Sequence, residues 1–492
     1  MLRTTSFAAS LLLVSVASTA QNLDEKVNQI LSEPAAQRAV FGIHVVEPAT
    51  GRVVYARSAG LPMTPASNTK LLATVLSLAR LGPDYRFETR ILTAKPPDSD
   101  GKITGDLRLV GGGDPTMSAR EIPYKKGAIE GDPLKPLAEL ANKVVEAGVR
   151  IIDGDIIGDD TRWPWSPYPD GWTVDDTVWE YGAPVSALTL NDNALLLYIR
   201  PGKKPGETAE ISLTPPVEYY TIHNTLKTHT GAPRSITVDR QPNSRVLLIG
   251  GTAAPNGGAA SQLIAIDDPA AFAAQAFAEL LRARGVTIRG SVRAAHRLPG
   301  QPYEPPTGVE LARRVSPPLI EILKVVNKVS QNLHAEIVLR EVGFIKRSEG
   351  TADAAQEEMT EFLTGLGVDR KDFALVDGSG LSRRTLATPA TFTTVLRYMH
   401  NSPLRDAFWA LLPIAGEDGT LNNRFHGFKE VTAIRAKTGS ISHVAALSGY
   451  AGEDSGRRLA FSILVNDYTA PTSEIRAIVD KIAVAILEEG KR

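Results

Sequence analysis

Alternating patterns of apolar and polar residues predict strands at both ends of the chain. Residues 41–47 alternate, the turn sequence Pro-Ala-Thr-Gly follows at 48–51, and residues 52–58 return as a second strand, which predicts a β-hairpin. Residues 433–438, 443–452 and 458–466 predict three further strands in succession. An antiparallel sheet of about five strands, built from both chain ends and covered by helices, is the economical α+β assembly.

Helical periodicity predicts the helices that cover this sheet. Apolar residues recur with helical spacing between 71 and 79, and Gly82-Pro83 ends that helix. A C-terminal helix at 473–489 gathers its largest aliphatic side chains on one face. That face is expected to pack on the sheet, with a position flat on a membrane surface as the alternative. Its residues are Ile475, Ile478, Val479, Ile482 and Ile486.

The region from 90 to 299 has a different character, rich in glycine and short strands. Two units within it share the order helix, glycine, strand: 137–147 with Gly148 and 149–156, then 277–284 with Gly285 and 286–292. They indicate an internal duplication or a common local solution to ending a helix. A Pro-rich linker at 299–307 leads back to the main domain. The predicted layout is a signal peptide (1–20), a catalytic domain in two parts (21–89 and 300–492), and one or two inserted β-rich domains (90–299).

The first twenty residues are typical of a secretory signal. Arg3 precedes a short apolar core, and Ser18 and Ala20 place small residues where a signal peptidase cleaves, so cleavage is expected after Ala20. The apolar run is about half the length that a membrane anchor needs. The chain has no cysteine, which fits a periplasmic or secreted protein.

The overall composition excludes several classes of function. With 54 basic and 55 acidic residues, the net charge is near zero. The sequence has no dense run of Lys and Arg that would indicate a nucleic-acid partner. The eight histidines are scattered without metal-ligand spacing. We therefore predict no metal, no cofactor and at most peripheral membrane association.

The first string with candidate chemistry is Ser67-Asn68-Thr69-Lys70 at the start of the predicted helix. Residues three apart share one helix face, so Ser67 could act as a nucleophile and Lys70 as its proton acceptor. The alternative is a serine N-cap followed by a solvated lysine. With an ordinary pKa, only about one lysine in 2,500 is neutral at pH 7, and lowering the pKa to about 7 takes roughly 4–5 kcal/mol. Burial and the second cation Lys437 could supply that energy.

Two further strings follow in order along the chain. Ser330-Gln331-Asn332 comes after a helix predicted from Leu319; Ser330 could relay a proton to a leaving amine, and Asn332 could bind a peptide. Lys437-Thr438-Gly439-Ser440 ends a strand, where the residues could hold a substrate carboxylate, with Gly439 leaving room for its approach. The backbone N–H groups of Ser67 and Ser440 could form an oxyanion hole. The alternatives are a polar helix end and a plain turn.

Read together, the three strings resemble the active-site motifs of penicillin-recognising enzymes. With the LVGGGDP sequence at 109–115 and the DGSGLSR sequence at 377–383, the chain resembles the D-alanyl-D-alanine carboxypeptidase/endopeptidase family of class C low-molecular-mass penicillin-binding proteins, peptidase family S13. Ser330 comes 263 positions after Ser67, a separation that resembles this family's large insertion. The loop 377–383 is expected to support the site rather than react.

The resemblance implies a penicillin-binding, serine β-lactamase-like fold and an exported serine DD-peptidase that cleaves peptidoglycan stem peptides or cross-links. It implies acylation of Ser67 by substrate or β-lactams, and it matches Asp160, beside the equally acidic Asp159, to an insert-domain aspartate near the stem-peptide side chain. The alternatives are a serine β-lactamase or esterase on the same fold, and a non-catalytic wall-binding protein. The site residues that it implies are Ser67, Lys70, Ser330, Asn332 and Lys437 for catalysis, and Thr438, Gly439, Ser440 and Asp160 for substrate binding.

Overall fold

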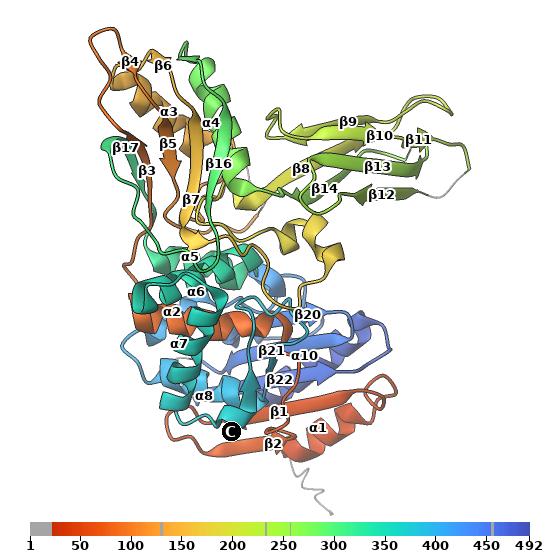
Figure 1. The fold of residues 1–492 in the computed structure, drawn as a ribbon. Coiled ribbons are helices and arrows are strands. Elements are labelled where there is room, and N and C mark those ends of the chain that lie inside the picture. Colours follow the sequence, from red (N-terminus) through yellow and green to blue (C-terminus); the bar gives the residue numbers. More distant parts are fainter. Residues whose placement is uncertain (1–21, 128–130, 232–233, 256, 454–456) are drawn as a thin grey trace, which may run out of the picture.

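The structure, a computed structural model, describes residues 22–127, 131–231, 234–255, 257–453 and 457–492. The predicted signal peptide therefore lies outside the described residues. One part of the molecule holds a five-stranded sheet with helices on both faces, and a second part, made of the inserted region, stands above it with a flat β-rich unit projecting to one side (Figure 1). The predicted α+β fold with a β-rich insertion is confirmed.

The five-stranded sheet joins the two ends of the chain. Its order is β2-β1-β22-β21-β20, and every neighbouring pair is antiparallel. β1 bridges the ends, since Ile43 pairs with Ile463 of β22. β21 and β22 are buried along their whole length because helices cover both faces. The strands are β1 (Val40–Val46), β2 (Val53–Arg57), β20 (Ile434–Ile441), β21 (Val444–Ala451) and β22 (Leu459–Asn466).

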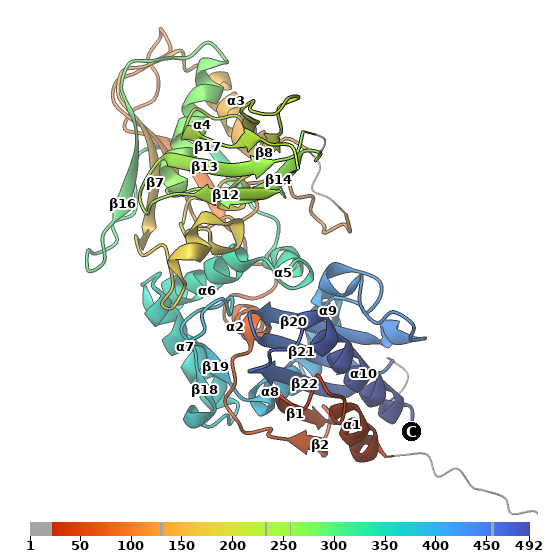
Figure 2. The same cartoon turned by 90° about the vertical axis from the view of Figure 1, so that its right-hand side faces the viewer.

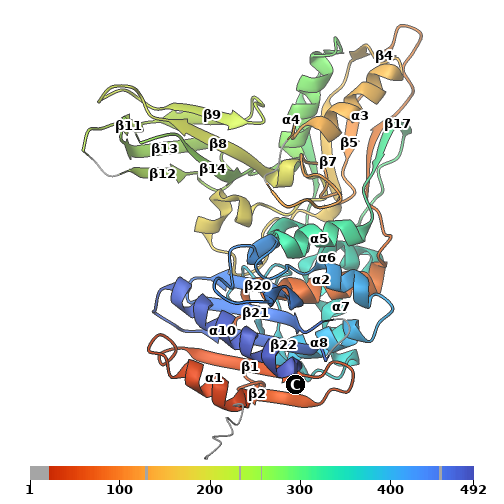
Figure 3. The same ribbon diagram turned by 180° about the vertical axis from the view of Figure 1, so that it is seen from behind.

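Helices from three stretches of the chain cover this sheet. α1 (Leu23–Leu31) and α10 (Thr472–Gly490) lie together on one face, and the remaining helices lie on the other (Figures 2 and 3). The latter are α2 (Thr69–Leu81), α5 (Leu319–Lys328), α6 (Asn332–Arg347), α7 (Ala352–Gly365), α8 (Pro389–His400) and α9 (Arg405–Leu411), with the short strands β18 (Phe373–Ala374) and β19 (Leu386–Ala387) beside them.

α10 packs on the sheet, as its pattern predicts. Ile475, Ile478 and Ile482 are buried in one cluster with Phe461 and Val465 of β22. Among the described helices, none is both long and apolar enough to cross a membrane.

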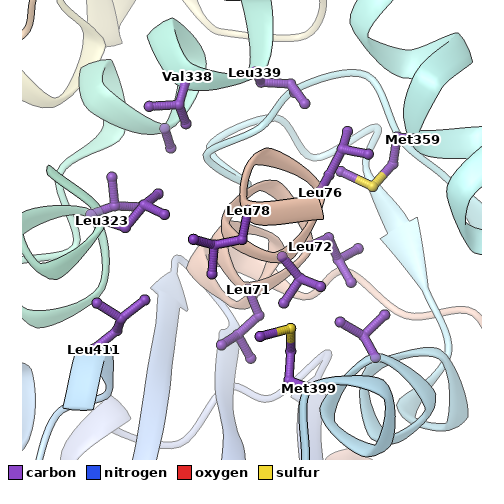
Figure 4. Packing of buried hydrophobic residues seen from close by; sticks show 14 of the residues in the cluster. Leu71, Leu72, Leu76, Leu78, Leu323, Val338, Leu339, Met359, Met399 and Leu411 are labelled. Atoms are coloured by element: carbon purple, nitrogen blue, oxygen red, sulfur yellow. The ribbon is translucent and has the colours of Figure 1, made fainter. Parts of the chain in front are cut away.

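α2 runs through the centre of the helical layer. Leu71, Leu72, Leu76 and Leu78 point outward in different directions and meet side chains from the surrounding helices (Figure 4). Every residue from Thr69 to Leu78 is buried. A helix enclosed on all sides has little freedom to rotate or slide, so the serine and lysine at its start are held in place.

The inserted region begins with a second five-stranded sheet, β16-β7-β5-β3-β17, continued by three short strands, β15-β6-β4. α3 and α4 pack against each other and on this sheet. The elements are β3 (Glu88–Thr93), β4 (Lys102–Ile103), β5 (Leu107–Val110), α3 (Lys135–Glu146), β6 (Ile151–Ile152), β7 (Ile156–Pro164), α4 (Pro269–Arg282), β15 (Thr287–Ile288), β16 (Val292–Arg297) and β17 (Val309–Val315).

The two look-alike units lie side by side in this sheet. β6 pairs in parallel with β15, and β7 pairs in parallel with β16. β4 and β5 form a third unit of two successive short strands, since β4 pairs with β6 and β5 pairs with β7. The sequence patterns did not reveal this third unit. A glycine, Gly105, Gly154 or Gly290, interrupts each unit. A Cβ on Gly154 would lie 2.3 Å from the Gly105 backbone, and one on Gly290 would lie 2.2 Å from the Gly154 carbonyl oxygen. Close stacking of backbones therefore requires glycine at Gly154 and Gly290.

The return to the catalytic domain comes later than the Pro-rich linker predicts. β17 pairs with β3 and so belongs to the inserted sheet, about fifteen residues beyond the predicted boundary at 299/300. The difference arises because proline and glycine residues indicate only that a segment lacks regular secondary structure. Which domain the following segment joins depends on strand pairing.

The unit projecting sideways is built from the middle of the insertion (Figure 1). It has one sheet of order β14-β8-β9 and another in which β13 pairs with β10, β11 and β12. The strands are β8 (Ala194–Arg200), β9 (Glu210–Thr214), β10 (Thr221–Asn224), β11 (Lys227–Thr228), β12 (Ser235–Asp239), β13 (Val246–Ala253) and β14 (Ala260–Ala265).

Candidate active site

Ser67 and Lys70 stand at the start of α2, in the order that the first string predicts. Ser67 lies in a short 3₁₀ turn (Ala66–Asn68), and Lys70 is in the first turn of the α-helix. The amine Nζ of Lys70 lies 2.9 Å from Oγ of Ser67, and the Lys70 side chain is fully buried. The alternative of a solvated lysine is therefore excluded.

Lys70 has three polar partners. Besides Ser67, its Nζ lies 2.6 Å from Oδ1 of Asn332 and 2.8 Å from the carbonyl oxygen of Ser379. A neutral amine has two N–H groups and one lone pair. The two oxygens can accept only the two N–H groups, so the lone pair of a neutral Lys70 faces the Ser67 hydroxyl. This geometry suits a proton acceptor.

Burial lowers the pKa of the Lys70 amine to about 7, although the nearby carboxylates of Asp377 and Glu336 oppose that shift. Burial also holds the pKa of Lys437 well below its ordinary value, and the charge of Lys70 lowers it further. Two buried amines whose charges repel do not both remain protonated at neutral pH. The predicted pairing of two lysines in one site is present, with burial as the larger cause of both shifts.

The second string lies between two helices. α5 ends at Lys328, Ser330 takes a left-handed backbone with φ of 66°, and Asn332 begins α6. Nζ of Lys437 donates to Oγ of Ser330 at 2.8 Å. The five residues predicted to carry catalysis therefore form two hydrogen-bonded groups drawn from three distant parts of the chain. Lys70 bonds to Ser67 and Asn332, and Lys437 bonds to Ser330.

The third string lies on β20, the edge strand of the sheet. Oγ1 of Thr438 donates to Thr420, and Oγ of Ser440 accepts from Arg476 of α10 at 3.1 Å. A Cβ on Gly439 would lie 2.6 Å from the Pro65 carbonyl oxygen and 3.1 Å from the Asn68 nitrogen. Glycine is thus required for β20 to pack against the Ser67 segment, a different reason from the predicted room for substrate.

A cavity of about 480 Å³ opens in front of this cluster. Ser67, Ser330, Asn332 and Ser440 all line it, together with residues 380, 381, 383, 441 and 442. The remaining wall comes from the inserted region: Gly171, Thr173, Asp176, Glu180 and Tyr181.

The insertion is tied directly to the second string. The carbonyl oxygen of Tyr181 accepts a hydrogen bond of 2.7 Å from Nδ2 of Asn332, whose Oδ1 faces Lys70. This contact also fixes which way the Asn332 amide points. Sequence reasoning missed Tyr181, since nothing in the pattern around it indicates the contact.

Asp160 is not brought into this cavity, which corrects its predicted place. It is buried within the insertion, where it accepts from Ser186 at 2.9 Å and faces Nδ1 of His296 at 2.8 Å. Its neighbour Asp159 pairs with Arg108. The cavity's carboxylates come instead from Asp176 and Glu180. Asp159 and Asp160 are both buried, and the segment at 171–181 reaches the site only through tertiary packing.

The loop at 377–383 supports the site, as predicted. Backbone N–H groups of Gly378 and Ser379 donate to Glu336, and Asp377 accepts from Ser379, Ser382 and Thr385. Burial and the charge of Asp377 raise the pKa of the Glu336 carboxyl to about 7. Sequence reasoning missed Glu336, although its position four residues after Asn332 places it on the same helix face.

An α+β domain of this topology, with an Ser-Lys-Ser-Asn-Lys cluster at its sheet edge, defines the class of penicillin-recognising serine enzymes. The chain belongs to the D-Ala-D-Ala carboxypeptidase 3 (S13) family, whose sequence model matches residues 23–486. The predicted family and enzyme class, a serine D-Ala-D-Ala peptidase, are confirmed.

Individual relatives agree with this placement. A D-alanyl-D-alanine carboxypeptidase of Actinomadura sp. (strain R39) is 34% identical over 478 residues, which cover 95% of this chain and 84% of the relative. D-alanyl-D-alanine carboxypeptidase DacB of Haemophilus influenzae is 26% identical over 415 residues, covering 83% and 81%. The crystal structure of penicillin-binding protein 4 (dacB) from H. influenzae has the same fold, with a TM-score of 0.81, 24% identity, and coverage of 96% and 99%.

Proposed function

We propose that Ser67 is the nucleophile of an exported DD-peptidase that cleaves the bond before a terminal D-alanine, or a cross-link, in peptidoglycan peptides. The observation that carries this proposal is the Lys70 amine, buried, 2.9 Å from the Ser67 hydroxyl, and with both N–H groups taken by other acceptors. Neutral Lys70 takes the proton of Ser67 while Oγ attacks the peptide carbonyl. The backbone N–H groups of Ser67 and Ser440 stabilise the oxyanion.

The leaving amine receives its proton through Ser330. Lys437 donates to Ser330, and Ser330 lines the same cavity as Ser67, where its hydroxyl can pass the proton of Lys70 to the leaving group. A substrate carboxylate at Thr438 and Ser440 favours the charged form of Lys437. Since the two lysines do not both stay protonated, binding of that carboxylate also favours neutral Lys70. Substrate binding therefore prepares the base.

The peptide segment on the acyl side lies in the cavity between Asn332, Arg383 and the inserted residues 171–181. Gln331 does not enter this scheme, because its side chain caps α6. Water then hydrolyses the acyl-enzyme, and β-lactams acylate the same serine. Cleavage of the signal peptide after Ala20 and action in the periplasm or outside the cell complete the proposal.

The direct test is release of D-alanine from a pentapeptide ending in D-Ala-D-Ala, together with covalent labelling by a fluorescent penicillin. We expect both from the wild-type protein. If the chain were instead a β-lactamase, the penicillin label would be lost rapidly by hydrolysis and no D-alanine would be released. A wall-binding protein without activity would show neither reaction.

Acylation is expected to rise with pH through about 7. Protonated Lys70 cannot accept the Ser67 proton, so below its pKa of about 7 the rate falls about tenfold per pH unit, and above it the rate levels off. The acylation rate constant for a fluorescent penicillin, measured from pH 5 to 9, checks this. A rate independent of pH across that range would contradict a lysine base with this pKa.

Substituting Asp176 and Asp160 separately by asparagine tests which of the two aspartates contacts the substrate. Asp176→Asn is expected to raise KM for a stem peptide by about threefold to tenfold, since Asp176 lines the cavity and a charged contact contributes roughly 1 kcal/mol. Asp160→Asn, the matched control, is expected to leave KM unchanged and to lower thermal stability through its contacts with Ser186 and His296. The reverse order of KM effects would restore Asp160 as the substrate contact.

A further inference from the structure

A second and larger cavity, of about 870 Å³, lies next to the active site. Residues 120, 121 and 124–127 of the insertion form part of its wall, including Arg120 and Lys126, and β14 contributes Leu263. The catalytic domain contributes Val329 and Thr420. The volume falls in the range of sites that bind small molecules and short peptides.

This cavity adjoins the active-site cavity on one particular side. Glu180 lines both cavities, and Val329 directly precedes Ser330. Thr420 accepts a hydrogen bond of 2.8 Å from Thr438. Ser330 is the residue proposed to protonate the leaving amine, so the second cavity begins where the leaving group departs.

The wall combines charged and apolar groups. Arg120 pairs with Asp192 at 2.6 Å, and Lys328 pairs with Asp418 at 2.6 Å. Lys126 donates to the backbone carbonyl of Glu417, which leaves its positive charge available to an anionic ligand. Leu263 is 43% exposed. The wall also holds the carboxylates of Glu121, which pairs with Lys125, and Glu180. Such a wall suits a peptide that carries charged groups of both signs and some apolar surface.

We propose that this second cavity binds the leaving strand of a cross-linked substrate, the peptide whose amine departs when Ser67 is acylated. The proposal rests on the proposed function of Ser67. The bond between the D-alanine carbonyl carbon and the amine nitrogen of the second strand breaks, and an ester bond to Ser67 forms. The Ser67 proton passes by Lys70 and Ser330 to that amine, and water later hydrolyses the ester. A leaving D-alanine is too small to extend into the cavity, so only cross-link cleavage uses it.

Two variants test the cavity without touching the catalytic groups. Leu263→Trp narrows it, and Lys126→Glu reverses a charge in its wall. For each, kcat/KM is measured for a cross-linked peptide dimer and for D-alanine release from the pentapeptide. We expect a loss of about tenfold or more on the dimer, equal to about 1.4 kcal/mol, and no change on the pentapeptide. Leu248→Trp is the matched control, because Leu248 is 41% exposed on the neighbouring sheet of the same unit and lies outside the cavity.

The outcomes separate the two proposals. Equal losses on both substrates, or no loss on either, would overturn the leaving-strand site while Ser67 acylation by penicillin still supports the proposed function. A wild-type protein that neither releases D-alanine nor is labelled by penicillin would overturn the proposed function and the leaving-strand site with it.

A separate observation concerns the buried carboxylate of Glu336. Its Oε1 accepts from the backbone N–H of Gly378 at 2.9 Å and of Ser379 at 2.8 Å. The carbonyl oxygen of the same Ser379 accepts from Lys70 at 2.8 Å. Glu336 sits on α6, which also carries Asn332, the other acceptor for Lys70.

We propose that Glu336 is a positioning residue, which holds the Ser379 carbonyl against Lys70 so that the lone pair of the neutral amine faces Ser67. The charged groups around it are Asp377, Arg340 and Lys70. Its negative charge raises the pKa of Lys70, so it also opposes the effect of burial.

Glu336→Gln and Glu336→Ala distinguish the two effects. The glutamine keeps an oxygen acceptor and loses the charge, so the acylation rate should retain its plateau and reach half of it at a lower pH than in the wild type. The alanine loses both, so the plateau should fall by about tenfold or more, as expected for a poorly placed base. If both variants lowered thermal stability equally and left the plateau and the midpoint unchanged, Glu336 would be only structural.

Discussion

Replacing Ser67 by alanine is expected to abolish covalent labelling by penicillin and to reduce D-alanine release by at least about 10⁴-fold, as loss of a nucleophile does in other serine enzymes. The side chain lies at the cavity wall and carries the only hydroxyl that bonds to the buried Lys70 amine among the described contacts. Labelling is measured by gel fluorescence, and D-alanine release by a coupled assay.

Ser77→Ala is the matched control for that change. Ser77 is a buried serine of the same helix, whose hydroxyl donates to the Ala73 carbonyl at 2.7 Å, two turns beyond Lys70. The Ser77→Ala variant should be labelled by penicillin to the same extent as the wild type. Labelling that survives Ser67→Ala would show that another group is acylated and would reject the proposed chemistry.

Lys70→Met is expected to give the second large loss. A general base contributes about 10²–10⁴-fold, so the acylation rate should fall by that factor and its rise with pH through about 7 should disappear. The fold should survive. The methionine side chain avoids the free-energy cost of burying an amine, and this gain offsets the cost of leaving the oxygens of Asn332 and Ser379 without a hydrogen bond, at about 1–3 kcal/mol each.

The measurement is stopped-flow acylation beside a thermal unfolding scan. Lys324→Met, which removes a lysine paired with Glu321 on α5, should leave acylation unchanged. A wild-type acylation rate in Lys70→Met would assign the base to another group, and a strongly lowered melting temperature would mean that the amine is needed for folding.

Much of the catalytic domain was predictable because apolar residues alternate with polar ones in its strands and recur with helical spacing in its helices. The three final strands and the N-terminal hairpin lie within a few residues of their predicted bounds, and the isoleucine face of α10 packs as expected. The boundary near 300 was less well placed, because β17 joins the insertion through pairing with β3, more than two hundred residues earlier. Local composition does not encode such a pairing.

The candidate site divides in the same way. The residue types of the three strings predicted which side chains meet. Lys70 bonds to Ser67 and Asn332, and Lys437 bonds to Ser330. The predicted position of Asp160 was wrong. A resemblance to a family gives a position along the chain, but it does not give the direction in which a side chain on a buried strand points. Tyr181 and Ser379 contribute backbone carbonyls, and any residue type supplies a carbonyl, so no sequence signal marks them.

The pairing of Ser67 with Lys70 follows from local sequence alone, since a spacing of three residues in a helical turn places two side chains together whatever surrounds them. The sequence also determined the order of the three strings and the sheet built from both ends. The burial of Lys70, the two acceptors of its amine besides Ser67, and the part of the cavity wall that comes from the insertion all result from long-range packing. These depend on contacts between segments far apart in the chain, where packing and desolvation, rather than local periodicity, set the free energy.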